Sequence, residues 1–307
     1  MLINNGKGEF TNAPEAMRMS LDSLGMVTDA AWLDVDNDGR KDLIVCGEWM
    51  KLHLLLNKDG KLTDLSDHYF PDTLKGWWNR LQLADMDGDG DMDIIAGNWG
   101  LNSPIKVSRS EPATIFYNDF DNNGSVDPLI CYYIQGTSYP MASRDEMTDQ
   151  IVSLRQRFPT YDSYANATIE DVLTPEQLKS AKQLSANYFE TTYFENNNGV
   201  FEARKLPVQA NFFPVFAIST GDFTHDGKPD IILAGNTDHA RIKIGKIDAG
   251  YGVLLKGDGK GHFEYVPQLK SGLSVKGCTR DIIKINEKNK NHLIFAVNSQ
   301  SPVIYSY

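Results

Sequence analysis

The chain has 307 residues, of which 41% are hydrophobic and 23% are charged, so it can bury a substantial core and wholesale disorder is excluded. Asp and Glu (41) outnumber Lys and Arg (30), and the resulting net charge of -11 argues against a nucleic-acid partner, which needs a basic surface. No apolar stretch is long enough for a transmembrane helix, and the N-terminus lacks a signal-peptide pattern.

The acidic residues gather in four nine-residue segments that share one pattern. Oxygen-bearing side chains, mostly aspartates, occupy positions 1, 3 and 5, a Gly occupies position 6, and an Asp closes the segment at position 9. In chain order the segments are DVDNDGRKD (34–42), DMDGDGDMD (85–93), DFDNNGSVD (119–127) and DFTHDGKPD (222–230). We call them the first to fourth loops.

Each loop is expected to hold one structural Ca2+ ion, up to four in all. Ca2+ takes six to eight oxygen ligands and tolerates irregular geometry, which suits side chains at positions 1, 3, 5 and 9 with a backbone carbonyl at position 7. An EF-hand is excluded because position 12 is never Glu. The expected ligands are Asp34, Asp36, Asp38, Arg40 and Asp42; Asp85, Asp87, Asp89, Asp91 and Asp93; Asp119, Asp121, Asn123, Ser125 and Asp127; and Asp222, Thr224, Asp226, Lys228 and Asp230.

The alternative is that the loops are ordinary Asp-Gly turns that bind no ion. It has most weight for the fourth loop, where Thr224 replaces the second Asp and His225 lies beside it. In the third loop Asn123 is a neutral donor, which should weaken binding without abolishing it.

Short apolar runs flank every loop, and Asn-Gly or Asp-Gly hairpin signals follow downstream. The repeating unit is therefore strand, Asp loop, strand, strand, hairpin, strand. Such repeats predict an all-β fold, a β-propeller of four-stranded blades, with about five blades in this chain and six or seven also open. The two chain ends supply complementary parts of one blade, so we expect residues 2–10 to pair with residues 303–307 and close the ring.

A long gap between the third and fourth loops predicts an insertion. Ser143 and Glu146 form a capping-box pattern, and Met147 begins a set of apolar residues at helical spacing. Thr174-Pro175 begins a second predicted helix. We therefore expect a single propeller domain over residues 1–307, with a small helical insertion over residues 135–188 inside one blade.

The loops resemble the FG-GAP or VCBS repeat, whose best-known members are the integrin α-subunit propellers. The phrases IVCGEW, IIAGNW and IILAGN beside the loops support the resemblance, and residues 97–207 look like bacterial surface proteins of the cartilage acidic protein type, common in Bacteroidetes. The resemblance implies an extracellular, periplasmic or outer-membrane surface location. It also implies that the chain is a propeller excised from a longer protein with further domains.

The face opposite the Asp loops is the expected ligand-binding face. Two kinds of connection should lie there: those joining strands 2 and 3 of a blade, and those joining strand 4 to the next blade. Together they contain four of the five tryptophans, along with residues 236–239 and 299–300. The candidate ligand-binding residues are Trp49, Trp78, Arg80, Asn98 and Trp99. Exposed indoles with polar neighbours suit an extracellular glycan or protein ligand. The alternative is that these rings pack between blades or under the insertion.

The function predicted from the sequence is a calcium-stabilised binding or adhesion module. An unrecognised carbohydrate-active enzyme, a glycosidase or lyase, is the alternative, because Glu48 with Asp145 or Glu146 could form an acid/base pair. No G-x-S-x-G motif and no phosphate-binding glycine loop occurs, so no catalytic residue is assigned.

Overall fold

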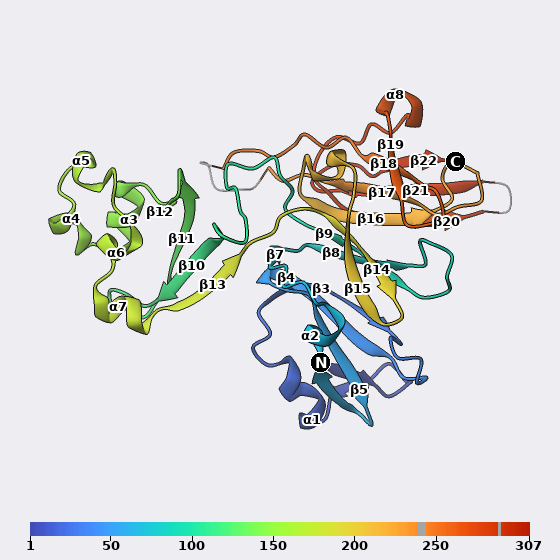
Figure 1. The fold of residues 1–307 in the computed structure, drawn as a ribbon, viewed down its shortest axis with the longest axis horizontal. Helices are drawn as coiled ribbons and strands as arrows, with labels where there is room; N and C mark the ends of the chain where they lie inside the picture. The colour runs from blue at the N-terminus through green and yellow to red at the C-terminus, as the bar shows by residue number, and fades with distance from the viewer. Residues whose placement is uncertain (239–243, 288–289) are drawn as a thin grey trace. The chain divides into compact units, whose positions relative to one another are not determined.

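The computed structural model describes residues 1–238, 244–287 and 290–307. The chain divides into two compact units, which are considered separately: the first unit comprises Met1–Ser103 and Phe189–Tyr307, and the inserted unit comprises Pro104–Tyr188 (Figure 1). No helix among the described residues is both long and apolar enough to cross a membrane.

Within its described residues the first unit contains four antiparallel sheets of three or more strands, besides a two-stranded hairpin at the N-terminus. The first sheet consists of β3 (Met26–Leu33), β4 (Asp42–Met50), β5 (His53–Lys58) and β6 (Lys61–Asp64), with β7 (Gly76–Trp77) also pairing with β4. The second consists of β8 (Arg80–Ala84), β9 (Asp93–Gly97), β14 (Thr192–Asn197) and β15 (Val200–Lys205). The third consists of β16 (Val215–Gly221), β17 (Asp230–Gly235), β18 (Val253–Gly257) and β19 (Phe263–Val266), and the fourth of β20 (Thr279–Asn286), β21 (Asn291–Val297) and β22 (Val303–Ser306).

Short helical segments connect these sheets. They are α1 (Glu15–Arg18) and η1 (Met19–Leu21) before β3, α2 (Ser66–Tyr69) after β6, η2 (Val208–Asn211) before β16, and α8 (Gln268–Ser271) after β19. Two of the predicted hairpins form at the expected dipeptides. Asp59-Gly60 and Asn198-Gly199 all have positive φ, as two-residue type I′ turns require.

Each Asp loop joins the first strand of a sheet to its second strand. The first loop connects β3 to β4, the second β8 to β9, and the fourth β16 to β17. Because neighbouring strands are antiparallel, the connection from the second to the third strand lies at the other end of the sheet. The predicted order of strand, loop and strand is therefore confirmed in these three sheets.

Successive sheets share hydrophobic cores. In β17, Ile231 and Leu233 join a cluster with Ile95 and Tyr193 of the second sheet. The alternate residues of β17, such as Ile232, join a second cluster with residues of the fourth sheet. Because side chains alternate along a strand, a strand buried on both faces has a continuous apolar run, as β17 does.

The inserted unit interrupts the second sheet between β9 and β14, and it is larger than the expected excursion over residues 135–188. It contains a four-stranded sheet of β10 (Ala113–Asn118), β11 (Asp127–Ile134), β12 (Thr137–Pro140) and β13 (Lys182–Ala186), with β10 and β11 joined by the third loop. Its helices are α3 (Arg144–Gln150), α4 (Leu154–Arg157), α5 (Tyr161–Tyr164), α6 (Ile169–Val172) and α7 (Pro175–Ser180). The sheet pairs β13 with β10, so a segment on each side of the helices is needed to complete it.

The predicted capping box is confirmed, although the first predicted helix is broken in two. The Ser143 hydroxyl accepts from the Glu146 N–H, and the Glu146 carboxylate accepts from the Ser143 N–H at 2.7 Å. The chain leaves helical geometry at Ile151, between α3 and α4. Ile151 still packs with Leu129 of β11 in one hydrophobic cluster. The spacing of the apolar residues therefore predicted which side chains are buried, but not that the helix is continuous.

The expected pairing between the chain ends is not found among the described strands. β1 (Leu2–Asn4) pairs with β2 (Phe10–Asn12) as a separate hairpin, and β22 pairs with β21. The apolar residues Leu2 and Phe10 are about 60% exposed. The Asn-Gly turn therefore satisfies this segment locally, without a partner strand from the C-terminus.

Candidate metal centre

Three loops bring their carboxylates at positions 1, 3 and 9 together. In each group one carboxylate oxygen per residue lies within 4.8 Å of the others. The triads are Asp34, Asp36 and Asp42; Asp85, Asp87 and Asp93; and Asp119, Asp121 and Asp127. Three convergent carboxylates offer the hard oxygen ligands that Ca2+ prefers.

The carboxylate at position 1 organises the turn of each loop. The two oxygens of Asp34 accept the N–H groups of Asp38 and Gly39, both at 3.0 Å. Asp119 accepts from the same two positions of the third loop. Gly39 has a φ of +84°, a conformation that favours glycine, which explains why position 6 is Gly.

The carboxylate at position 9 ties the loop to its sheet. Asp93 is fully buried and accepts from Met86 N at 2.9 Å, from Asn196 N at 2.8 Å and from the Tyr193 hydroxyl at 2.9 Å. Asn196 belongs to β14, the third strand of the second sheet. Asp42 makes the matching pair of contacts, with position 2 of its loop and with the third strand of the first sheet. The aspartate at position 9 is therefore a member of the triad and also links the loop to the third strand of its sheet by hydrogen bonds.

Burial and nearby charges raise the pKa of the carboxylate at position 9 in the first and second loops. Burial raises the pKa of Asp93 to about 6, and the nearby Asp87 carboxylate adds to the effect. Burial also raises the pKa of Asp42, helped by the charges of Asp36 and Asp38. A divalent cation among the three carboxylates would offset this repulsion. The donor set and its electrostatics therefore fit calcium.

Positions 5 and 7 lie outside the triads. The side chain at position 5 turns toward the N–H of position 7 in each loop: Asp38 accepts from Arg40 N at 2.9 Å, and Asp89 accepts from Asp91 N at 2.8 Å. Asn123 does the same with Ser125 N at 2.8 Å. These contacts stabilise the turn. The roles of positions 5 and 7 as additional ligands remain predictions.

The fourth loop keeps the turn but forms no triad among the described residues. Asp222 accepts from the N–H groups of positions 5 and 6, and Asp230 accepts from Phe223 N at 2.9 Å, as in the other loops. At position 3, however, the buried Thr224 hydroxyl has no hydrogen-bond partner within the described part of the chain. The Lys256 ammonium lies 2.9 Å from Asp226. The fourth loop therefore lacks the carboxylate triad of the other three loops, and its set of metal ligands stays a prediction.

The tryptophans expected to form an exposed platform are largely packed inside the first unit. Trp49 is 6% exposed and Trp78 is fully buried. The Trp77 ring lies 4.9 Å from Trp49, 5.1 Å from Trp99 and 4.7 Å from Phe189, measured between centroids. Trp99 is half-buried. The expectation that the indoles are exposed is therefore wrong for Trp49 and Trp78, which are buried by packing.

The polar members of the expected ligand set also have structural partners. The Asn98 side chain is fully buried and accepts from Trp77 N at 3.0 Å and from Trp99 N at 2.9 Å. The Arg80 guanidinium lies 2.8 Å from the Asp281 carboxylate and 3.6 Å from that of Asp29. These contacts hold together connections and first strands of different sheets.

The carboxylates considered for acid/base chemistry lie in different units. Glu48 belongs to the first unit, where burial raises its pKa. In the inserted unit Glu146 caps α3, and Asp145 accepts from the Tyr161 hydroxyl at 2.6 Å.

Two residues that shape the loops were missed by the sequence analysis. The Tyr193 hydroxyl donates to Asp93 although the two residues are 100 positions apart, so no local sequence motif predicts this contact. Lys256 lies in the third strand of the third sheet, and its pairing with Asp226 depends on the strand register. The substitution at Thr224 was the one local signal that this loop differs.

A comparison with protein-family models agrees with the geometry of the loops. Residues 34–96 match the model of the FG-GAP-like repeat. The chain contains an FG-GAP-like repeat. The matched span begins at the first loop, continues through the rest of the first sheet, and includes the second loop, so it holds two of the three triads. No curated protein matches the chain.

Proposed function

We propose that this chain is a calcium-stabilised extracellular binding module that recognises a glycan or protein ligand. The carrying observation is the repetition of the same three-carboxylate arrangement in three separate sheets, always between the first and second strands. An ion at this connection would fix the turn and reduce carboxylate repulsion. Calcium in this proposal is structural, and the opposite ends of the sheets are left for the ligand.

We further propose that the sheets of the first unit are blades of a β-propeller, with their first strands innermost. The contacts of Arg80 support this arrangement. Arg80 lies in β8, and its two carboxylate partners, Asp29 and Asp281, lie in β3 and β20. First strands of the first, second and fourth sheets thus meet at one guanidinium, as expected for strands that surround a common axis.

A binding and turnover assay tests the functional proposal. The protein is incubated with a panel of host and dietary glycans in Ca2+ and in EGTA, and both retention and product release are measured. The expected result is retention without product in Ca2+, with loss of retention in EGTA in parallel with loss of thermal stability. Release of shortened glycans would instead support the enzyme alternative. If EGTA changed neither glycan retention nor thermal stability, the proposal would be contradicted.

A further inference from the structure

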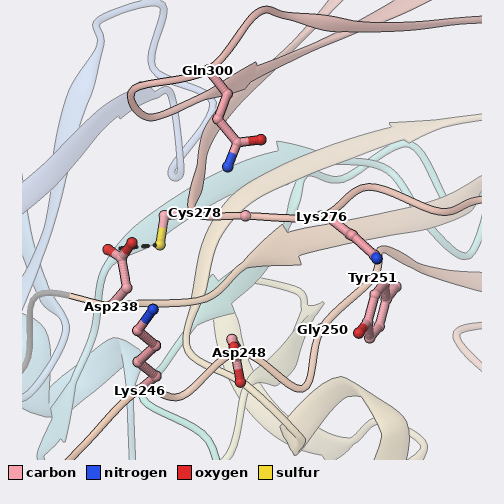
Figure 2. Close-up of a pocket in the computed structure, with 9 residues that line it drawn as sticks. Asp238, Lys246, Asp248, Gly250, Tyr251, Lys276, Cys278 and Gln300 are labelled. Atoms are coloured by element: carbon pink, nitrogen blue, oxygen red, sulfur yellow. Dashed lines mark hydrogen bonds between the residues drawn. The ribbon is translucent and has the colours of Figure 1, made fainter.

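A polar pocket lies at the end of the third sheet that is opposite its Asp loop, where residues beside the fourth sheet also line it. Its volume is about 340 Å3, near the small end of the range typical of ligand pockets, about 300–1,000 Å3. The lining residues come from the β17–β18 connection, the segment before β20 and the β21–β22 turn: Asp238, Lys246, Asp248, Gly250, Tyr251, Lys276, Gly277, Cys278 and Gln300 (Figure 2). His239, expected on the same face, lies outside the described residues.

A buried asparagine fixes the floor of this pocket. Asn236 is 2% exposed, and its amide donates to the carbonyls of Gly250 at 2.7 Å and Gly277 at 3.0 Å. Its side-chain oxygen accepts from Gly250 N at 2.9 Å. A Cβ on Gly250 would approach the Phe213 ring to 2.5 Å, so the backbone needs glycine there. One side chain therefore holds two connections from different parts of the chain in register.

Cys278 and Asp238 complete the fixed part of the pocket. The Cys278 thiol donates to Asp238 at 3.1 Å. Burial, followed by the Asp238 carboxylate, raises the pKa of this thiol, so it stays protonated at neutral pH. The thiol thus positions Asp238 and is a poor nucleophile, which favours binding over covalent chemistry at this pocket.

The rim of the pocket carries polar groups that the protein leaves for a ligand. Within residues 1–238, 244–287 and 290–307, the side chains of Lys246, Asp248, Tyr251, Lys276 and Gln300 have no hydrogen-bond or ion-pair partner. In the view of Figure 2 Lys276 and Tyr251 are drawn on one side of the pocket, and Lys246 and Asp238 on the other. The unpaired groups include two ammonium ions and one carboxylate, and Asp238 adds a second carboxylate to the lining, so the pocket offers both positive and negative groups on a chain whose net charge is -11.

We propose that this pocket binds a monosaccharide unit that carries a carboxylate. The proposal rests on the proposed function as a binding module and names the ligand chemistry. The sugar carboxylate binds the Lys276 ammonium, and the sugar hydroxyls donate to Asp248 and accept from the Gln300 amide. The Tyr251 ring supplies an apolar surface for one face of the sugar. The volume accommodates a single small ligand, and the exposed rim lets the remainder of a polymer extend into solvent.

The test is a titration with methyl β-D-glucuronide in Ca2+, followed by NMR chemical-shift changes, with methyl β-D-glucoside and inorganic phosphate as comparison ligands. The glucuronide should bind at least about tenfold more tightly than the other two, because loss of a charge-assisted contact has that size. Lys276→Met should reduce glucuronide affinity by about tenfold. Asp248→Asn should reduce the affinity for the glucuronide and the glucoside alike.

Lys260→Met is the matched control, because Lys260 is an exposed lysine of the β18–β19 turn, outside the pocket. This variant should bind the glucuronide as the parent does. Equal affinity for phosphate and glucuronide, or no binding of either, would overturn the proposal, as would unchanged affinity in both Lys276→Met and Asp248→Asn. Retention of other glycans in the same preparation separates failure of this inference from failure of the proposed function, and a melting curve in Ca2+ verifies the fold of each variant.

Discussion

The second and fourth loops have the same turn but different electrostatics. In both, position 1 accepts the N–H of the glycine at position 6, at 3.1 Å in the second loop and 2.9 Å in the fourth, and position 9 accepts the N–H of position 2 at 2.9 Å. Position 3 is Asp87 in the second loop and Thr224 in the fourth. The backbone frame of the loop is therefore separable from the carboxylate triad that would hold an ion.

The two loops also differ in how their acidic groups are balanced. Burial raises the pKa of Asp87, and the surrounding carboxylates of Asp89 and Asp85 contribute. In the fourth loop a hydrogen bond from Lys256 lowers the pKa of Asp226. One loop thus concentrates negative charge that a cation could neutralise, whereas the other is already paired with an ammonium. This comparison predicts calcium at the first three loops and none at the fourth.

Chelation should have the largest effect, because it removes every ion at once. An ion present at 100 times its dissociation constant stabilises the folded state by about 2.7 kcal/mol, so removing several should lower the melting temperature by many degrees. Differential scanning calorimetry in excess EGTA and after addition of Ca2+ measures the change. An unchanged melting curve would show that the triads hold no stabilising ion.

The buried aspartate at position 9 should stabilise the fold even without calcium, through its hydrogen bonds. Asp93→Ala leaves two N–H groups and the Tyr193 hydroxyl without their acceptor, which should lower the free energy of unfolding by about 3 kcal/mol in EGTA. Asp91→Ala in the same loop is the control, because the Asp91 carboxylate is outside the triad. Urea unfolding in EGTA compares the two variants. Equal free energies of unfolding for Asp93→Ala and Asp91→Ala would contradict this structural role of Asp93.

Substitution at position 3 should separate the two loops directly. Asp87→Ala should remove one ion and its stabilisation, about 2.7 kcal/mol at 100 times the dissociation constant, with little change in EGTA. Thr224→Ala should leave the number of bound ions unchanged. Calorimetric Ca2+ titrations of both variants check this difference. Loss of an ion in Thr224→Ala would mean that the fourth loop binds calcium after all.

The smallest effect is expected from converting the fourth loop into a triad. The double variant Thr224→Asp and Lys256→Met supplies the missing carboxylate and removes the competing ammonium. It should gain one weak Ca2+ site, seen as an additional event in a calorimetric titration, whereas Lys256→Met alone should gain none. Absence of the extra site would mean that the backbone frame of this loop is insufficient for binding.

Local and distant interactions explain which parts could be predicted from the sequence. The triads were predictable because positions 1, 3 and 9 lie within nine residues, and their hydrogen bonds are made largely inside the loop. The burial of Trp49 and Trp78 was not predictable, since it depends on ring contacts between residues that are distant in sequence. Trp78 packs near Phe194, and Trp49 packs on Trp77, which also contacts Phe189. Adjacent residues of an extended segment, such as Trp77 and Trp78, point to opposite sides, but the sequence does not show what covers either ring.

The inserted unit and the pocket illustrate the same limit. The helix caps at Ser143 and Thr174 were readable because capping is local. The pairing of β10 with β13 joins segments on both sides of the helices, and only the sheet register reveals it. The pocket likewise depends on Asn236 contacting both Gly250 and Gly277, which lie 14 and 41 positions away.

The most direct test of the central claim is the number of Ca2+ ions bound by the chain at equilibrium. The decalcified protein is titrated with Ca2+ in a calorimeter, and the stoichiometry is verified by elemental analysis after gel filtration. The structure predicts three ions per chain, falling to two in Asp87→Ala and staying at three in Thr224→Ala. No bound calcium in the parent chain, or an undiminished count in Asp87→Ala, would contradict the account.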